Sequence, residues 1–427
     1  MSGTDCNGLE PDSLRKIPTT TCAPGVKKCV RGKWLFLGAF VFACFLFWWL
    51  PSLIFRAIVH RSDAVEDATV AISLLALVLF IVGYLIPSPG RSTRWISAHM
   101  LDACGSFAYR VTGLLFVPAL LVSVQLWYSR VGMVYGSGDP IPRPYQALLY
   151  THLFFGFMYL GAADPESQGW RRILTAATLV TLPRLIVSLH GGRFFLAQAV
   201  VPAILIAVAH GWIRFSFKRV TQFAMLALAL IFVPPLTRGD EVIGREESIT
   251  FFAAGSSLRL YQDNTDLNLS GRCPPLVVSL TAKLIPYGAM GICVVDIGGL
   301  KDMPATLDRI LTVNDPSSFN GTVSGTGSNF LLDLYLFGGL FAVFAGSTLF
   351  GFSCRRFVTW IGKRSLFSGI WAECLTRALM APRSSLGYVY ERIPSLILAT
   401  LLVVVIVWAG CLLKRESVTR SATGFAF

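Results

Sequence analysis

The sequence predicts an all-α integral membrane protein with about ten transmembrane helices and one large external loop. Two observations support this fold class. First, 54% of the residues are hydrophobic, only 14% are charged, and the mean hydropathy is +0.61, whereas soluble domains have about 25% charged residues. Second, apolar stretches of about 18 residues or more, the length that crosses about 30 Å of hydrocarbon, recur along the chain.

The N-terminal part of the chain predicts a short tail followed by a bundle of helices. Residues 1–33 are polar and end in a basic stretch, so we expect a disordered cytoplasmic tail. Residues 34–235 then form the N-terminal transmembrane bundle. Its predicted spans are 34–58, 67–86, 111–128, 145–162, 173–190, 194–213 and 220–235.

The C-terminal part begins with a long polar interruption. Residues 236–329 form the large loop, and loops of this length in compact proteins are usually functional or disordered. Residues 330–413 then carry three more spans, and 414–427 form a second cytoplasmic tail. These spans are 330–352, 366–382 and 394–413, and Glu373 and Arg377 interrupt the middle one.

The distribution of basic residues predicts the orientation, because cytoplasmic loops are enriched in Lys and Arg. Basic clusters precede the first span, occupy alternate connections and follow the last span: Lys27, Lys28, Arg31 and Lys33; Arg91, Arg94 and Arg110; Arg171 and Arg172; Arg214, Lys218 and Arg219; Arg355, Arg356, Lys363 and Arg364; Lys414, Arg415 and Arg420. Both termini are therefore expected in the cytoplasm, with the large loop outside. On the external side arginine far outnumbers lysine, and arginine offers a planar set of donors that matches phosphate.

An external turn between the fifth and sixth spans carries the first candidate site residues. Arg184 lies inside the apolar span, where a charge is costly and indicates a functional site. His190 and Arg193 flank the glycines of the turn, and all three side chains are candidates to bind an anionic substrate. The alternative is an anchor, in which the arginines reach the lipid headgroups and the histidine is solvated.

The start of the large loop mixes arginines with carboxylates. Arg238, Arg245 and Arg259 are candidate substrate-binding residues, and Asp240 and Glu241 are candidate bases. Such a mixture can bind an anion and keep a proton acceptor close to it. It is equally typical of a salt-bridged surface helix, which contributes little energy.

The run from Ser324 to Gly339 is the most distinctive motif. Ser328 and Asn329 precede an apolar helix, where hydroxyls and backbone N–H groups favour anions. Asp333 and Tyr335 follow within about one turn, so the first is a further candidate catalytic residue and the second a candidate substrate-binding residue. Alternatively, Asp333 pairs with an arginine of another span to hold the bundle together.

No motif predicts a metal, a cofactor or a nucleic-acid partner. The histidines are far apart along the chain: His60, His99, His152, His190 and His210. The sequence has neither a phosphate-binding loop of the Walker type nor a dinucleotide-binding glycine motif. The expected partners are a lipid-linked substrate and the bilayer itself.

In its layout the chain resembles the Wzy-type O-antigen and exopolysaccharide repeat-unit polymerases. The resemblance rests on the external turn with Arg184 and Arg193, on the large external loop, and on the motif from Gly325 to Gly339 followed by a basic inner loop and two last spans. O-antigen ligases have a similar layout but typically carry a His-Asn pair where this chain has Ser328 and Asn329. That departure favours a polymerase.

The resemblance implies a bundle like that of GT-C glycosyltransferases in a bacterial cytoplasmic membrane. It implies that the enzyme polymerises oligosaccharide repeats carried on undecaprenyl pyrophosphate, beside a flippase and a chain-length regulator. Arginines would stabilise the leaving pyrophosphate, and no cofactor is needed because the donor is already activated. The alternatives are an O-antigen ligase, a transporter or flippase of an anionic lipid-linked glycan, and a structural subunit.

Overall fold

The computed structural model describes residues 24–50, 53, 66–87, 96–129, 142–189, 193–213, 329–384, 386–390 and 392–423. This part of the chain is almost entirely helical and contains no strand. Three of its helices, α3 (Asp67–Leu85), α4 (Ala98–Tyr128) and the Ile393–Leu413 part of α17 (Ile393–Thr423), are long and apolar enough to cross a membrane. The predicted all-α class and the membrane-spanning character are confirmed at this level.

The remaining helices complete a bundle in chain order. They are α1 (Pro24–Cys44) with the π-helical turn η2 (Phe45–Trp49), α5 (Arg143–Ala162), α6 (Pro165–Gln168), α7 (Trp170–Ser188), α8 (Arg193–Ala209), α14 (Phe330–Ile361), α15 (Ser368–Met380), the 3₁₀ turn η5 (Ala381–Arg383) and α16 (Leu386–Tyr390). Polar side chains cap three of the helix starts: Ser97 for α4, Asp164 for α6 and Asn329 for α14. Each of these side chains accepts a hydrogen bond from an amide of the first turn, which has no acceptor within the helix.

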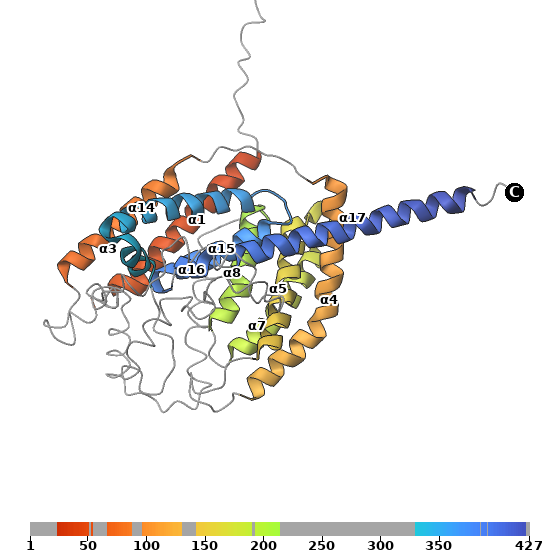
Figure 1. The fold of residues 1–427 in the computed structure, drawn as a ribbon, viewed down its shortest axis with the longest axis horizontal. Helices are drawn as coiled ribbons and strands as arrows, with labels where there is room; N and C mark the ends of the chain where they lie inside the picture. The colour runs from red at the N-terminus through yellow and green to blue at the C-terminus, as the bar shows by residue number, and fades with distance from the viewer. Residues whose placement is uncertain are drawn as a thin grey trace, which may run out of the picture.

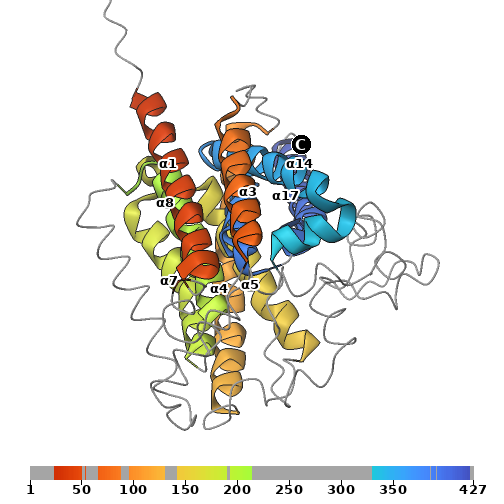
Figure 2. The same cartoon turned by 90° about the vertical axis from the view of Figure 1, so that its left-hand side faces the viewer.

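The helices pack in two groups that share one core. In Figures 1 and 2, α3 and α14 lie side by side on one flank with α1 next to α3, while α4, α5, α7 and α8 form the other flank. Helix α15 packs against α8, α14 and α5 and so joins the two groups. The C-terminal part of α17 extends past the bundle (Figure 1).

Several helices differ from the predicted spans. Helices occupy every predicted span except 220–235, which lies outside the described residues. Helix α1 begins at Pro24, inside the expected tail, and α4 begins at Ala98, thirteen residues before the predicted span. Helix α15 has 13 residues, and because a crossing needs about 20 residues it is too short to span a bilayer by itself.

Helix α14 is a helical hairpin, not a straight span. Gly338 and Gly339 interrupt it, and Gly339 has φ 60° and ψ −154°, a conformation that favours glycine. The first half folds back on the second, because the ring centroids of Phe330 and Phe350 are 5.4 Å apart. In a straight helix these residues would be separated by about 30 Å. The prediction of one continuous helix over 330–352 is therefore wrong, and Asp333 lies on the half-helix that folds back.

One end of the bundle is held by a group of ionic contacts, which we call the Arg364 end. Arg364, between α14 and α15, forms salt bridges with Asp102 of α4 and with Asp164, which precedes α6. Its Nε also donates to the carbonyl of Ala162 at 2.5 Å. The starts of α4 and α15 and the ends of α5 and α14 therefore meet at the Arg364 end.

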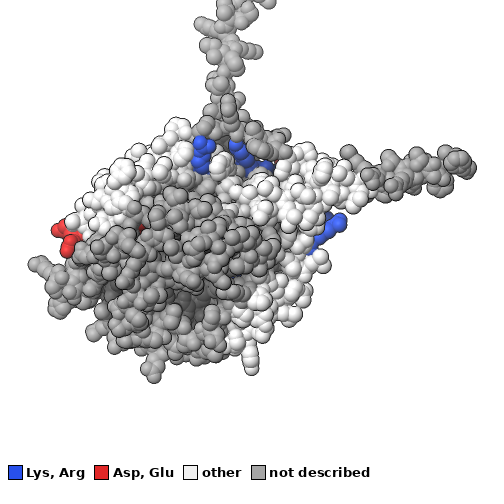
Figure 3. Space-filling model, viewed as in Figure 1, with Lys and Arg blue, Asp and Glu red and all other residues white. Residues whose placement is uncertain are grey.

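The described surface is largely apolar away from the helix ends. In Figure 3 most of the described surface is white, and the basic side chains gather at the upper edge and at the right-hand edge. Large apolar side chains are exposed along the middle of the outer helices, among them Leu114, Val117 and Leu121 on α4 and Leu401, Leu402 and Val405 on α17. A surface of this kind fits hydrocarbon better than water.

Candidate functional site

Tyr150 on α5 lies between two guanidinium groups that come from other parts of the fold. The Cζ atom of Arg392, in the turn between α16 and α17, is 3.6 Å from the centroid of the Tyr150 ring. The Cζ atom of Arg184 on α7 is 4.8 Å from the same centroid. Both contacts are cation–π interactions, which are strongest where water is excluded. The two guanidiniums are therefore in contact with the same aromatic ring.

Arg184 is almost completely buried, with 2% of its surface exposed. It lies one turn before the end of α7, and its guanidinium also lies 5.5 Å from the ring centroid of Phe195 on α8. His152, two residues after Tyr150, is buried nearby, and its Nε2 has no hydrogen-bond partner within the described residues. A buried guanidinium and a buried imidazole are costly in an apolar bundle. Their burial indicates a functional site by default.

A second buried arginine completes the group. Arg377 on α15 is 1% exposed, and its Nη2 lies 2.8 Å from Oε1 of Glu373 one turn earlier. Helix α15, which carries this ion pair, packs against α5, which carries Tyr150. The site therefore combines side chains from α5, α7, α15 and the start of α17. We call Tyr150, Arg184, Arg377 and Arg392 the arginine cluster.

The arginine cluster lies away from the Arg364 end of the bundle. Tyr150 precedes Ala162, at the Arg364 end, by twelve residues of α5, which corresponds to a rise of about 18 Å. Arg377 follows the first residue of α15 by nine residues, which corresponds to about 13 Å. The arginine cluster and the Arg364 end are therefore separate groups of charged side chains.

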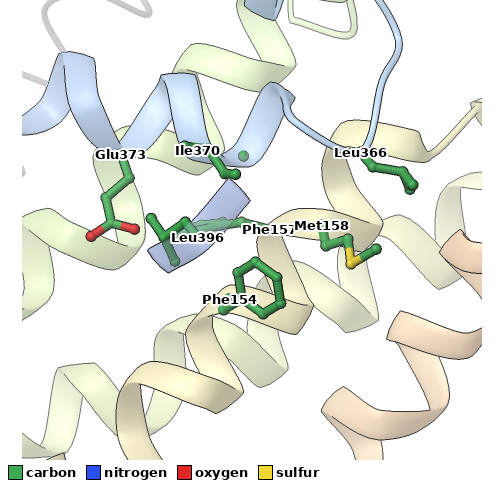
Figure 4. A pocket seen from close by; sticks show the side chains of 8 residues that line it. Phe154, Phe157, Met158, Leu366, Ile370, Glu373 and Leu396 are labelled. Carbon is green, nitrogen blue, oxygen red and sulfur yellow. The ribbon is translucent and has the colours of Figure 1, made fainter. Parts of the chain in front are cut away.

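A small cavity adjoins the ion pair. It lies between α5, α15 and α17. Its lining is apolar except for Glu373, and the other lining residues are Phe154, Phe157, Met158, Leu366, Gly369, Ile370 and Leu396. In Figure 4 Glu373 lies on one side of this space and Leu366 on the other. The carboxylate that pairs with Arg377 thus forms part of the wall of an apolar cavity.

The half-helix that opens α14 lies against the same central region. Asn329 caps it, since its Oδ1 accepts a hydrogen bond from the Leu332 amide at 2.7 Å. Asp333 is buried, and its Oδ2 accepts a hydrogen bond from the backbone N–H of Leu386 at 2.6 Å. Tyr335 is half-buried and packs on the core. The structure therefore gives Asn329 and Asp333 defined backbone contacts, and through Asp333 it links this half-helix to α16.

The structure describes some of the sequence-predicted site residues. Arg184 lies in the arginine cluster, and Asn329, Asp333 and Tyr335 lie on the half-helix. Arg193 is the first residue of α8, and its side chain lies outside the described part. The other candidates also lie outside the described residues: His190, Arg238, Asp240, Glu241, Arg245, Arg259 and Ser328.

Sequence reasoning missed the aromatic centre of the cluster. Tyr150 and His152 lie in a span that was predicted only from its hydropathy, Arg377 was noted as a charge that interrupts its span, and Arg392 was not among the candidate site residues. A signal was present, because a histidine and two arginines within or beside apolar spans are as unusual as Arg184. Nothing in the spacing along the chain indicates that these residues converge on one ring.

No family model, no curated protein and no solved structure matches this chain. The chemistry of the site follows from its donors. Two guanidiniums lie over one ring and a third is held by Glu373 on the neighbouring helix α15, and the planar donor set of arginine binds phosphate oxygens in pairs. The arginine cluster is therefore suited to bind a phosphorylated group.

Proposed function

We propose that this protein is a membrane glycosyltransferase that polymerises oligosaccharide repeats carried on undecaprenyl pyrophosphate. The observation that carries the proposal is the arginine cluster, whose Arg184 and Arg377 are buried in a bundle with helices long and apolar enough to cross a membrane. A lipid-linked pyrophosphate brings two adjacent phosphates and an apolar chain to the same place. The cluster offers guanidiniums to the phosphates, and the surrounding helices offer apolar surface to the chain.

In the proposed reaction the bond between the anomeric carbon of the donor and its pyrophosphate breaks. A hydroxyl of the incoming lipid-linked repeat forms the new glycosidic bond and loses its proton to a carboxylate. The candidate bases are Asp240 and Glu241, in the large loop. Undecaprenyl pyrophosphate leaves with the bonding electrons, and Arg184, Arg377 and Arg392 stabilise its developing charge.

The proposal includes the finer topology. Ten spans with both termini in the cytoplasm would put the loop 236–329 on the external face, where lipid-linked repeats are exposed after a flippase has delivered them. The basic residues at the Arg364 end, including Arg355 and Lys363, support a cytoplasmic position for that end. A chain-length regulator would be a further partner in the bacterial inner membrane.

Substitution of Arg184 tests the proposal. Arg184→Ala removes one buried donor and is expected to lower polymerisation about 10²–10³-fold, the usual effect of losing one such donor. The measurement is a gel profile of surface glycans from cells in which the variant replaces the native protein. The expected change is from a ladder to a single-repeat band. Arg171→Ala, an exposed site on the same helix, is the matched control and should keep the ladder.

A full-length ladder from Arg184→Ala, with protein present in the membrane, would show that Arg184 has no part in polymerisation.

One observation favours a second candidate, the transport of an anionic lipid-linked glycan. Helix α14 is broken and α15 is short, and transporters often bind their substrates at midplane sites between such broken helices. Loss of transport would abolish surface glycan completely, so the same gel distinguishes the two functions.

A further inference from the structure

The contact between Asp333 and Leu386 joins two segments that are 53 residues apart in the sequence. Leu386 is the first residue of α16, and the first amides of a helix have no acceptor within that helix. The Asp333 carboxylate supplies the acceptor for the Leu386 amide at 2.6 Å. Hydrogen bonds to a carboxylate are shorter and stronger than those between neutral groups. Asp333 therefore fixes the beginning of α16.

The rest of α16 and the turn after it are fixed as well. Val389 is buried in the core, and the ring of Tyr390 packs against Phe350 with a centroid distance of 6.4 Å. The carbonyl of Arg392 accepts the hydrogen bond from Leu396 that begins α17. The backbone of Arg392 therefore lies in a short turn between two anchored helices, and its side chain contacts Tyr150.

We propose that Asp333 is a positioning residue that holds Arg392 against Tyr150 through α16. The half-helix of α14 carries the carboxylate, α16 transmits its position, and Arg392 is the group that is placed. Asp333 then acts on the arginine cluster without accepting a proton from the substrate. The expected effect of Asp333 variants on polymer length rests on the proposed function. Their expected effect on the backbone of α16 does not.

Two variants of Asp333 separate positioning from acid–base chemistry. Asp333→Asn keeps a side-chain oxygen that can accept from the Leu386 amide but removes the charge and the basicity. Asp333→Ala removes the acceptor. If the alanine variant does not fold, Asp333→Gln is used in its place, because glutamine displaces the oxygen by one methylene. Amide hydrogen exchange of residues 386–392 in the full-length protein in detergent is measured beside the surface-glycan ladder.

We expect exchange at Leu386 to become about tenfold faster, or more, in Asp333→Ala, the factor that one hydrogen bond to a charged group provides. The ladder should shorten in the same variant, while Asp333→Asn should keep slow exchange and most of the ladder. An Asn variant that loses the ladder with native exchange would assign Asp333 as a base and overturn the proposal. Unchanged exchange in Asp333→Ala would also overturn it.

A different pattern would instead contradict the polymerase. If Asp333→Ala accelerates exchange while it and Arg392→Ala both leave the ladder intact, the positioning of Arg392 stands. In that case polymerisation does not depend on Arg392, and the proposed role of the arginine cluster fails.

Discussion

A tyrosine ring between two guanidinium groups changes what a pair of arginines can do. Two cations of the arginine cluster contact the Tyr150 ring, Arg392 at 3.6 Å and Arg184 at 4.8 Å from its centroid. The π-system attracts both cations, so the ring stabilises their approach and fixes their relative position. At the scale of single residues, the site therefore depends on an aromatic face as much as on charge.

Replacing Tyr150 tests the part played by the ring. Tyr150→Phe keeps both cation–π contacts and should leave a ladder of surface glycan with a small loss of length. Tyr150→Leu removes the π-face, and the loss of a desolvated cation–π contact, about 2 kcal/mol, should lower polymerisation roughly tenfold or more. The glycan ladder is compared at equal protein levels. Equal activity in Phe and Leu variants would show that the ring only fills space.

Individual residues also show the limits of sequence reasoning. Arg184 could be selected because a charge inside an apolar span is unusual by itself. Tyr150 could not, because a tyrosine in a helix is ordinary until its neighbours are known. Asp333 was predicted as a base or a structural partner, and its hydrogen bond to Leu386 could not be read from the sequence because the two residues belong to different helices.

Close backbone contact between α3 and α14 is the main feature at the scale of elements. A Cβ atom on Gly351 would overlap the backbone carbonyl of Phe80, and a Cβ atom on Gly83 would overlap that of Thr348. Small residues at such positions allow helices in a membrane to approach closely and gain van der Waals contact. Gly346 has a similar role within α14, where it accommodates the side chain of Leu334.

Gly351→Ala is therefore expected to separate the two helices and to lower stability by about 1–3 kcal/mol, the usual cost of overpacking. The measurement is the thermal unfolding midpoint in detergent. Gly113→Ala on α4 is the control, since a Cβ atom there meets no other atom within 4 Å. That variant should be neutral or stabilised by up to about 1 kcal/mol. Equal midpoints for the two variants would contradict the close contact.

Helix α14 shows why the sequence predicted its existence but not its path. Residues 330–352 are apolar, and hydropathy reports only that a segment avoids water. Gly338 and Gly339 form the turn of a hairpin. The choice between a kinked span and a hairpin depends on what the first half can pack against, here the aromatic core around Phe350.

The whole molecule has two dissimilar ends. The Arg364 end combines a salt-bridged arginine with neighbouring basic residues, among them Arg355 and Lys363. Helix α4 has its first turns, which include Asp102, at this end. It ends at Tyr128, at the opposite end of the bundle, and Tyr128 is 79% exposed. The arginine cluster lies between these two levels.

Accessibility of introduced thiols tests the proposed orientation. Lys363→Cys should react with a membrane-impermeant maleimide only after the cells are permeabilised, because the basic end is expected in the cytoplasm. Tyr128→Cys, at the opposite end of the bundle, should react in intact cells. Labelling of the unsubstituted protein gives the background from its native cysteines. The reverse pattern would invert the topology and move the large loop to the cytoplasm.

The sequence by itself determined the helical membrane class and the unusual character of a buried Arg184, because hydropathy and charge are properties of single segments. The tertiary structure decided that α14 folds back, that Asp333 caps α16, and that two arginines meet at Tyr150. These features depend on contacts between residues as far apart as Tyr150 and Arg392. Their convergence is set by how whole helices pack, and no local pattern in the chain encodes that packing.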